Sequence, residues 1–307
     1  MSSQSSQSQS RAEQVNALLE GAIDLHCHSG PAVMPRILDH HDALMDAAAA
    51  GFKAVVYKDH YYPGMAHAAI LEKLFFKDTG VRLFSGIVLN NAIGGWNPHA
   101  VDHTIKLGGK IVWLPTVSAA NHIAHVETGK TKSFPKTSQR MLDAIPLSAV
   151  DDKGRLLDPV KQVLDLIAEG DVLLAGGHLP VAELHLVFAE AKTRGVKKMM
   201  VNHPTYMVGA GDADIRDFAA VGVSMEHSIC MFVEGRSKRY SAADLKHLID
   251  TAGVDNTILS SDLGLGGCVR PVEGFRAIVE MLLDLQVTEA NIRRLVSTNA
   301  AAMLGLD

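Results

Sequence analysis

Paired cysteines and clusters of basic residues are both missing from this chain. Its three cysteines, Cys27, Cys230 and Cys268, are an odd number without a CxxC spacing, which argues against a disulfide framework and favours a reducing compartment. The formal net charge is -5 and the pI is near 6.3, with no long basic block. The sequence therefore offers no concentrated positive charge for nucleic acid or an anionic membrane to bind, and neither is expected as a partner.

Long apolar runs and a targeting signal are also missing. No stretch approaches the roughly 20 apolar residues that cross a bilayer. The first ten residues, MSSQSSQSQS, lack the basic start and apolar centre of a secretory signal, and their Ser/Gln bias is typical of disorder. We expect a cytoplasmic protein with a disordered tail over residues 1–15 and a single domain over residues 16–307.

The remaining sequence alternates short runs rich in Val, Ile and Leu with segments of helical period, commonly separated by Gly or Pro. The predicted strands are 22–28, 53–60, 81–89, 110–117, 172–178, 197–203, 222–227 and 256–262. The predicted helices between and after them are 39–50, 65–78, 98–107, 159–169, 181–194, 212–220, 241–252 and 271–285. Eight such units in about 260 residues predict an α/β fold, a (β/α)8 TIM barrel.

Two segments depart from this regular alternation. Residues 118–158 form a long insertion after the fourth strand, on the face where barrel enzymes keep their sites. We interpret it as a lid or an oligomer contact, although a loop with no role fits the pattern too. Residues 288–304 begin with Thr288, a suitable N-cap, and predict a closing helix.

The first predicted strand ends in an HxH triplet, His26-Cys27-His28. Alternate residues of a strand point to the same face, so both imidazoles leave the strand side by side. Two adjacent nitrogen donors suit a borderline divalent ion such as zinc. An isolated HxH fits two histidines without a ligand equally well, so other positions must decide.

Further polar residues stand at or near the C-terminal ends of other predicted strands, and these ends converge at the mouth of a barrel. They are Lys58 and His60 on the second strand, His178 on the fifth, His203 on the sixth and Asp262 on the eighth. Their number on one rim is hard to explain by chance. The pattern therefore favours a metal centre with a small-molecule substrate.

The chain resembles the amidohydrolase superfamily of metal-dependent barrel hydrolases across residues 22–304. The motifs are Asp-Leu-His-Cys-His (24–28), Gly-Gly-His (176–178), Asn-His-Pro (202–204), Ser-Ser-Asp-Leu-Gly (260–264) and a tail, Asn-Ala-Ala-Ala-Met-Leu-Gly (299–305). Their order along the strands is that of the family.

This resemblance implies a ligand set and a reaction. His26, His28, His178 and Asp262 would ligate a divalent metal, most simply Zn²⁺ with Mn²⁺ as an alternative. His203 would bind a second ion or polarise the substrate, and Asp262 would also take the proton from the metal-activated water. The implied protein is a hydrolase, and a homo-oligomer is the usual state of such enzymes.

One departure leaves the metal count open at one or two ions. Binuclear members hold a carboxylated lysine on the fourth strand, but 110–116 offers no lysine at its C-terminal end. Lys58 stands on the second strand instead, where it is a cationic anchor for a substrate carboxylate, an ion-pair partner or a carbamate bridge. Together with His60, and with Arg270 after the last strand, Lys58 is assigned to substrate binding.

The leading hypothesis is hydrolysis of an amide, cyclic amide or ester bond in a small, carboxylate-bearing molecule. A non-oxidative decarboxylase or other lyase on the same metal-binding barrel is the first alternative. The second is a phosphoesterase of the polymerase-and-histidinol-phosphatase type, because Tyr57-Lys-Asp-His-Tyr61 resembles its second motif. That family expects an Asp-x-His near the end of the barrel, where this chain has Asp262-Leu-Gly264.

Overall fold

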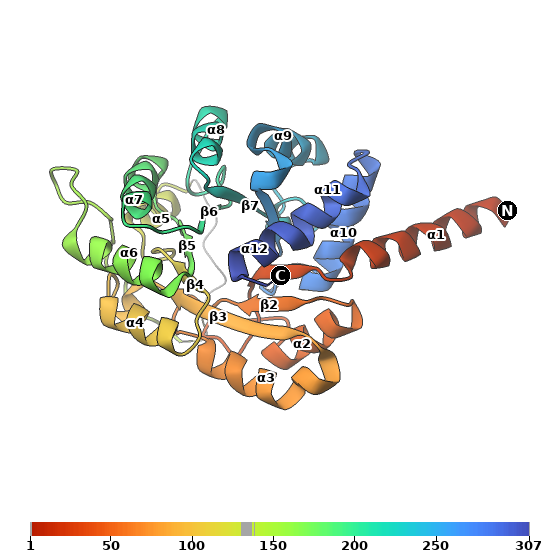
Figure 1. Ribbon diagram of the computed structural model, residues 1–307, viewed down its shortest axis with the longest axis horizontal. Helices are drawn as coiled ribbons and strands as arrows, with labels where there is room; N and C mark the ends of the chain where they lie inside the picture. The colour runs from red at the N-terminus through yellow and green to blue at the C-terminus, as the bar shows by residue number, and fades with distance from the viewer. Residues whose placement is uncertain (1, 130–136, 138, 307) are drawn as a thin grey trace.

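The computed structural model describes residues 2–129, 137 and 139–306. Eight parallel strands form one sheet in chain order, with helices packed around them (Figure 1). The strands are β1 (Ile23–Cys27), β2 (Ala54–Tyr57), β3 (Arg82–Val88), β4 (Ile111–Trp113), β5 (Leu173–Ala175), β6 (Met199–Asn202), β7 (Ser224–Ser228) and β8 (Thr257–Ser260). Each overlaps a predicted strand, so the (β/α)8 barrel is confirmed.

The helices confirm the predicted alternation and add two elements, α1 and α5. They are α1 (Ser2–Leu19), α2 (His40–Ala49), α3 (Met65–Thr79), α4 (Pro98–Lys106), α5 (Ala120–Glu127), α6 (Asp158–Gly170), α7 (Val181–Thr193), α8 (Asp212–Ala220), α9 (Ala242–Ala252), α10 (Pro271–Asp284), α11 (Glu289–Arg293) and α12 (Asn299–Leu304). Short helical turns are η1 (Asn91–Ile93), η2 (Ile229–Met231), η3 (Val254–Asn256) and η4 (Arg294–Thr298).

The barrel closes where the segment after β8 lies along the end of β1. The amide of Asp262 donates to the carbonyl of His26 at 2.7 Å, and the amide of His28 donates to the carbonyl of Leu263 at 2.8 Å. Gly264 has a φ of +121°, and a Cβ there would lie 2.1 Å from the His28 carbonyl oxygen. Only glycine permits this approach, which places Asp262 beside the HxH triplet.

Apolar side chains fill both the barrel interior and the layer between strands and helices. The interior holds Ile23, Leu25, Ala54, Val56, Phe84, Val88, Ile111, Trp113, Leu173, Ala175, Met200 and Ile258, together with Ala300 and Leu304 from α12. The C-terminal helix thus packs into the same core as the strands, as the predicted closing helix requires. Its approach begins at Thr288, whose side chain accepts a hydrogen bond from the amide of Asn291 at 3.3 Å.

The N-terminal segment differs from the disordered tail expected over residues 1–15, because α1 runs from Ser2 to Leu19 and its start extends away from the barrel (Figure 1). Val15, Leu18 and Leu19 are buried, and α1 contacts α10 and α11. Their spacing gives one apolar helix face, which the Ser/Gln bias of the preceding residues obscured. No described helix combines the length and apolar character needed to span a membrane.

The insertion at 118–158 contains a helix of its own, α5, and part of it, 130–136 and 138, lies outside the described residues. Its start is tied to a later part of the insertion, since the amide of Ala120 donates to the carbonyl of Leu147 at 2.8 Å. The predicted role as a lid or oligomer contact stays a prediction. What the structure adds is that α5 places His122 against His178.

Candidate metal centre

The two histidines of β1 leave the strand together, as alternation predicts. Their ring centroids lie 5.0 Å apart. The pairing of β1 with β2 shifts register between Asp24 and Cys27, and the carboxylate of Asp24 accepts from the amides of His26 at 3.0 Å and Ser261 at 2.9 Å. Asp24 therefore satisfies the amide that this irregularity frees and fixes the backbone under the HxH triplet.

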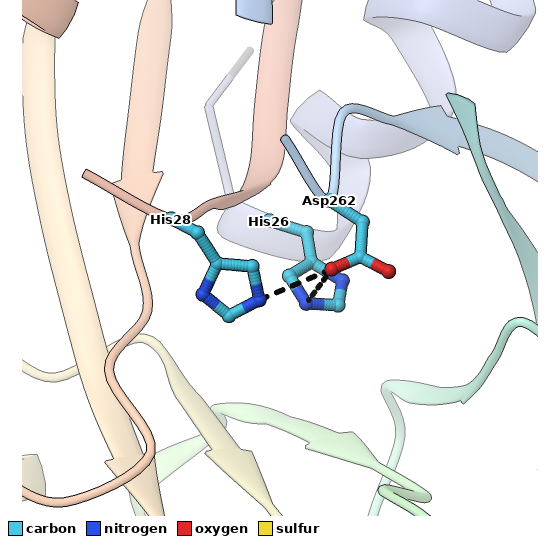
Figure 2. Close-up of side chains that lie close together, drawn as sticks. All are labelled: His26, His28 and Asp262. Atoms are coloured by element: carbon cyan, nitrogen blue, oxygen red, sulfur yellow. Dashed lines mark ion pairs between the residues drawn. The ribbon is translucent and has the colours of Figure 1, made fainter. Parts of the chain in front are cut away.

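Asp262 completes a cluster of three metal-ligand side chains with His26 and His28 (Figure 2). Oδ1 of Asp262 lies 3.2 Å from Nε2 of His26 and 3.1 Å from Nε2 of His28. Each residue offers one ligand atom, and these atoms all lie within 4.8 Å of one another. Two imidazole nitrogens and one carboxylate oxygen are a donor set that suits Zn²⁺.

Hydrogen bonds behind the histidines determine which ring nitrogen faces the cluster. Nδ1 of His26 donates to the carboxylate of Glu226 at 3.2 Å, and Nδ1 of His28 donates to the carbonyl of Lys58 at 3.0 Å. Both acceptors lack a proton to give, so each ring carries its proton on Nδ1 and presents the Nε2 lone pair to Asp262. Such outer hydrogen bonds are the usual support of metal-binding histidines.

The charges in this cluster call for a cation. Burial lowers the pKa of His28 to about 3, so its ring is neutral at pH 7. Burial raises the pKa of Asp262, but contact with His26 outweighs that effect and holds the pKa well below its usual value. An ionised carboxylate facing imidazole lone pairs at these distances needs positive charge nearby, which Lys58 supplies in this structure and a bound divalent ion would supply as well. The residues present therefore fit a divalent ion.

Lys58 supplies one positive charge from the side of β2. Its Nζ donates to Nε2 of His26 at 2.9 Å and lies 5.5 Å from the ring centroid of Trp113 on β4. The side chain is buried, and that burial lowers the lysine pKa to about 8. Lys58 thus belongs to the centre itself, and Trp113 lies close by on the strand that carries the carboxylated lysine in binuclear amidohydrolases.

His178 reaches the pocket from β5, and its backing comes from the insertion. Its Nδ1 lies 2.8 Å from Nδ1 of His122 on α5, and the two rings are stacked. Asn121 donates to the carbonyl of His178 at 3.1 Å. Gly177 makes the approach possible, because a Cβ there would lie 2.3 Å from the carbonyl of Leu114. His122 is buried.

His203 faces His178 from the segment after β6, with ring centroids 4.9 Å apart. Its Nδ1 makes a long contact of 3.4 Å with the carbonyl of Tyr206. His203 and Asp262 have φ values of +32° and +48°. A left-handed backbone costs free energy at residues other than glycine, and such residues concentrate at functional sites.

His60 lies on the same pocket, next to His28. The two ring centroids are 5.0 Å apart, and Nδ1 of His60 is 2.9 Å from the hydroxyl of Thr116. Burial, followed by the charges of His28 and Lys58, lowers the pKa of His60 well below its usual value. A neutral His60 therefore offers hydrogen bonds to a bound molecule rather than charge.

One pocket brings most of these side chains together. The described residues that line it are His28, Lys58, His60, His178, His203, Tyr206, Cys230, Met231, Arg236, Ser237, Arg239, Asp262 and Leu265. Arg270 is not among them, and its assignment to substrate binding stays a prediction. Its Nε pairs with Asp46 of α2 at 2.7 Å, because α10 begins directly after Arg270 and turns that side chain toward the helix layer.

Sequence reasoning missed several residues of this site. Cys230 has its thiol 3.7 Å from Oδ2 of Asp262, and Arg236 and Arg239 line the pocket. They lie several residues beyond the end of β7, and a search for polar residues at strand ends therefore does not find them. Glu226 lies in the middle of β7, and the structure places its carboxylate behind His26.

The sequence matches one known protein family. Residues 21–226 match the model of a family described as "Family of unknown function (DUF6282)". The chain belongs to this family. The match contains the histidines of β1, β5 and β6 and ends at Glu226, so Asp262 lies beyond the matched part of this DUF6282 chain. No curated protein matches the sequence.

Solved structures show the fold that this DUF6282 protein shares. An amidohydrolase from Pseudomonas aeruginosa is 13% identical with a TM-score of 0.65, over 96% of this chain and 98% of that one. The organophosphorus hydrolase of Deinococcus radiodurans is 16% identical, TM-score 0.54, over 93% and 92%. YJJV, a TatD homologue from Escherichia coli K12, is 14% identical, TM-score 0.53, over 94% and 100%. The amidohydrolase-type resemblance is thereby confirmed as a fold.

Proposed function

We propose that this DUF6282 protein is a metal-dependent hydrolase that cleaves an amide, cyclic amide or ester bond in a small, carboxylate-bearing molecule. The observation that carries the proposal is the convergence of His26, His28 and Asp262, with both Nδ1 protons held from behind by Glu226 and the Lys58 carbonyl. The hydrolases among its structural neighbours support the same reaction class.

The metal we propose is zinc, with manganese as the alternative, held by His26, His28 and Asp262. When bound, such an ion lowers the pKa of a water molecule toward about 7 and polarises the bond to be cleaved. His178 and His203 line the same pocket but do not join the three-residue cluster. We therefore assign His178 and His203 to contacts with the substrate. Binding of a second ion between them is the alternative.

The remaining chemistry belongs to the side chains. The Asp262 carboxylate is ionised and keeps 15% of its surface exposed toward the pocket, so it accepts the proton of the attacking water and returns it to the leaving group. His203 donates a hydrogen bond to the oxygen that becomes negative as the bond breaks. Nζ of Lys58 would leave the Nε2 lone pair of His26 to a bound ion, and Lys58, which lines the pocket, would then orient the substrate together with His60.

The first experiment measures metal per chain by inductively coupled plasma mass spectrometry on protein purified without chelator. About one equivalent is expected from the β1 and β8 ligands, and about two would assign the second to His178 and His203. No metal, together with no gain in activity when zinc or manganese is added, would overturn the proposal.

The second experiment identifies the reaction with a panel of carboxylate-bearing amides, cyclic amides and esters in water enriched in oxygen-18. Hydrolysis places solvent oxygen in the product. Release of carbon dioxide without solvent oxygen would assign the site to a decarboxylase instead.

A further inference from the structure

The mouth of the pocket is formed on one side by the segment that follows β7, from Met231 to Tyr240. Arg236, Ser237 and Arg239 of this segment line the same pocket as Asp262. Both arginines are exposed, whereas the histidines of the cluster are buried. The arginines therefore stand at the entrance and the cluster at the bottom.

The backbone of this segment is fixed rather than free. The amides of Arg239 and Tyr240 both donate to the carbonyl of Met231, at 2.8 and 3.0 Å, which closes the segment on itself. The amide of Arg236 donates to the carbonyl of Gly267 at 2.9 Å, which ties it to the segment after β8. A binding group on a preorganised backbone loses less freedom when a ligand arrives.

Tyr206 orients the second arginine. The guanidinium carbon of Arg239 lies 4.2 Å from the centroid of the Tyr206 ring, and Nη2 donates to the Tyr206 hydroxyl at 3.1 Å. A neutral ring holds the guanidinium plane without cancelling its charge. Tyr206 also contacts His203, at 5.9 Å between rings, so the entrance is linked to the catalytic side of the pocket.

The charge of the pocket favours an anion. Among its described lining residues, three are basic, Lys58, Arg236 and Arg239, and one is acidic, Asp262. Asp262 already faces the two histidines and the proposed ion. The lining therefore carries more positive than negative charge, which favours an anion over a cation as ligand and steers an anion inward from solution.

We propose that Arg236 and Arg239 form a binding site for a carboxylate at the pocket mouth, which holds the acid end of the substrate while its scissile bond lies against His26, His28 and Asp262. The planar fork of arginine matches the two oxygens of a carboxylate. This inference rests on the proposed function for the identity of the substrate, but carboxylate binding itself requires no metal.

The test titrates benzoate, and its neutral isostere benzamide, into chelator-treated protein, followed by two-dimensional NMR of ¹⁵N-labelled arginine side chains. Benzoate is expected to shift two arginine Nε signals that R236A and R239A remove, and benzamide to shift neither. Each alanine variant should weaken benzoate binding about 10- to 100-fold, the usual range for hydrogen bonds to a charged group. R194A is the matched control, because Arg194 directly after α7 pairs with Asp165, and it should bind benzoate like the unmodified protein.

The outcomes separate this inference from the proposed function. Equal binding of benzoate and benzamide, or unchanged binding in R236A and R239A, would overturn the carboxylate site even in an active metal hydrolase. Inorganic phosphate that binds ten times more tightly than benzoate would also overturn it, in favour of a phosphate site. Loss of benzoate binding in both variants, in a protein without metal or hydrolysis, would keep the site and remove the proposed function.

Discussion

The two walls of the pocket are built in different ways. On the β1 and β8 wall, His26, His28 and Asp262 come from strand ends that bond to each other, and their ligand atoms lie within 4.8 Å. On the β5 and β6 wall, His178 is backed by His122 of the insertion, and His203 has a 3.4 Å contact behind it. The first wall is part of the barrel, whereas the second depends on segments added to it.

This difference indicates that the two walls have different roles, one in binding the metal and the other in acting on the substrate. Backing by a buried carboxylate, as Glu226 gives His26, raises the basicity of the ring and favours a cation. Backing by another neutral imidazole, as His122 gives His178, fixes a ring without adding charge. We therefore expect the first wall to determine metal affinity, and through Asp262 the proton transfer as well, whereas changes to the second wall should affect turnover without affecting metal affinity.

The largest expected effect comes from Asp262→Asn on the first wall. The amide keeps the shape but loses the charge that balances the cation and the base that takes the proton. We expect turnover to fall about 10²- to 10⁴-fold, the range for loss of a general base, with bound metal reduced as well. The measurements are kcat on the best substrate of the panel and metal per chain.

Circular dichroism supplies the control for Asp262→Asn, since the barrel should keep its secondary structure and thermal transition. A folded variant with full turnover would remove Asp262 from the centre. The first wall would then consist of His26 and His28 alone.

A smaller effect is expected from Glu226→Gln, which lies behind the first wall. The glutamine carbonyl still accepts from His26 Nδ1, but the negative charge is gone. Metal affinity should fall about 10- to 100-fold, as is usual when an outer partner of a ligand changes, and chelator competition measures it. Glu183→Gln is the matched control, because Glu183 accepts from Ser148 at 2.8 Å, far along the chain from the ligands. Unchanged affinity in Glu226→Gln would show that the carboxylate does not support the metal.

The first wall was predictable from the sequence, because strand alternation and the order of strand ends place His26, His28 and Asp262 together. The second wall was predictable only in part. His178 and His203 stand at strand ends, but His122 contacts His178 from an insertion whose course no periodicity reveals. Arg270 also follows a strand end, and the structure pairs it with Asp46 of α2.

The entrance of the pocket was the least predictable part. Arg236 and Arg239 come eight and eleven residues after Ser228, the end of β7, in a segment held by backbone bonds to Met231 and Gly267. Such contacts depend on how two loops meet in space. Sequence patterns describe strands and helices because these repeat, and loops do not repeat.

The smallest effect is expected from His122→Ala on the second wall, and it tests the separation of roles directly. Removal of the imidazole leaves Nδ1 of His178 without its 2.8 Å partner, so the His178 ring should exchange between its two tautomers. Two-bond ¹H–¹⁵N NMR of labelled histidine detects this tautomer exchange in protein without metal or substrate. Turnover should fall about tenfold, the low end for an outer-partner change, while metal per chain stays the same.

His125→Ala is the matched control for His122→Ala, because His125 lies on the same helix and its Nδ1 donates to the carbonyl of Asn121 at 2.7 Å. It should leave the His178 tautomer and turnover unchanged. Loss of metal in His122→Ala would contradict the comparison, since it would make His178 a ligand as essential as His26. Retained metal with an altered His178 tautomer would show that the insertion tunes the catalytic wall while the barrel alone holds the ion.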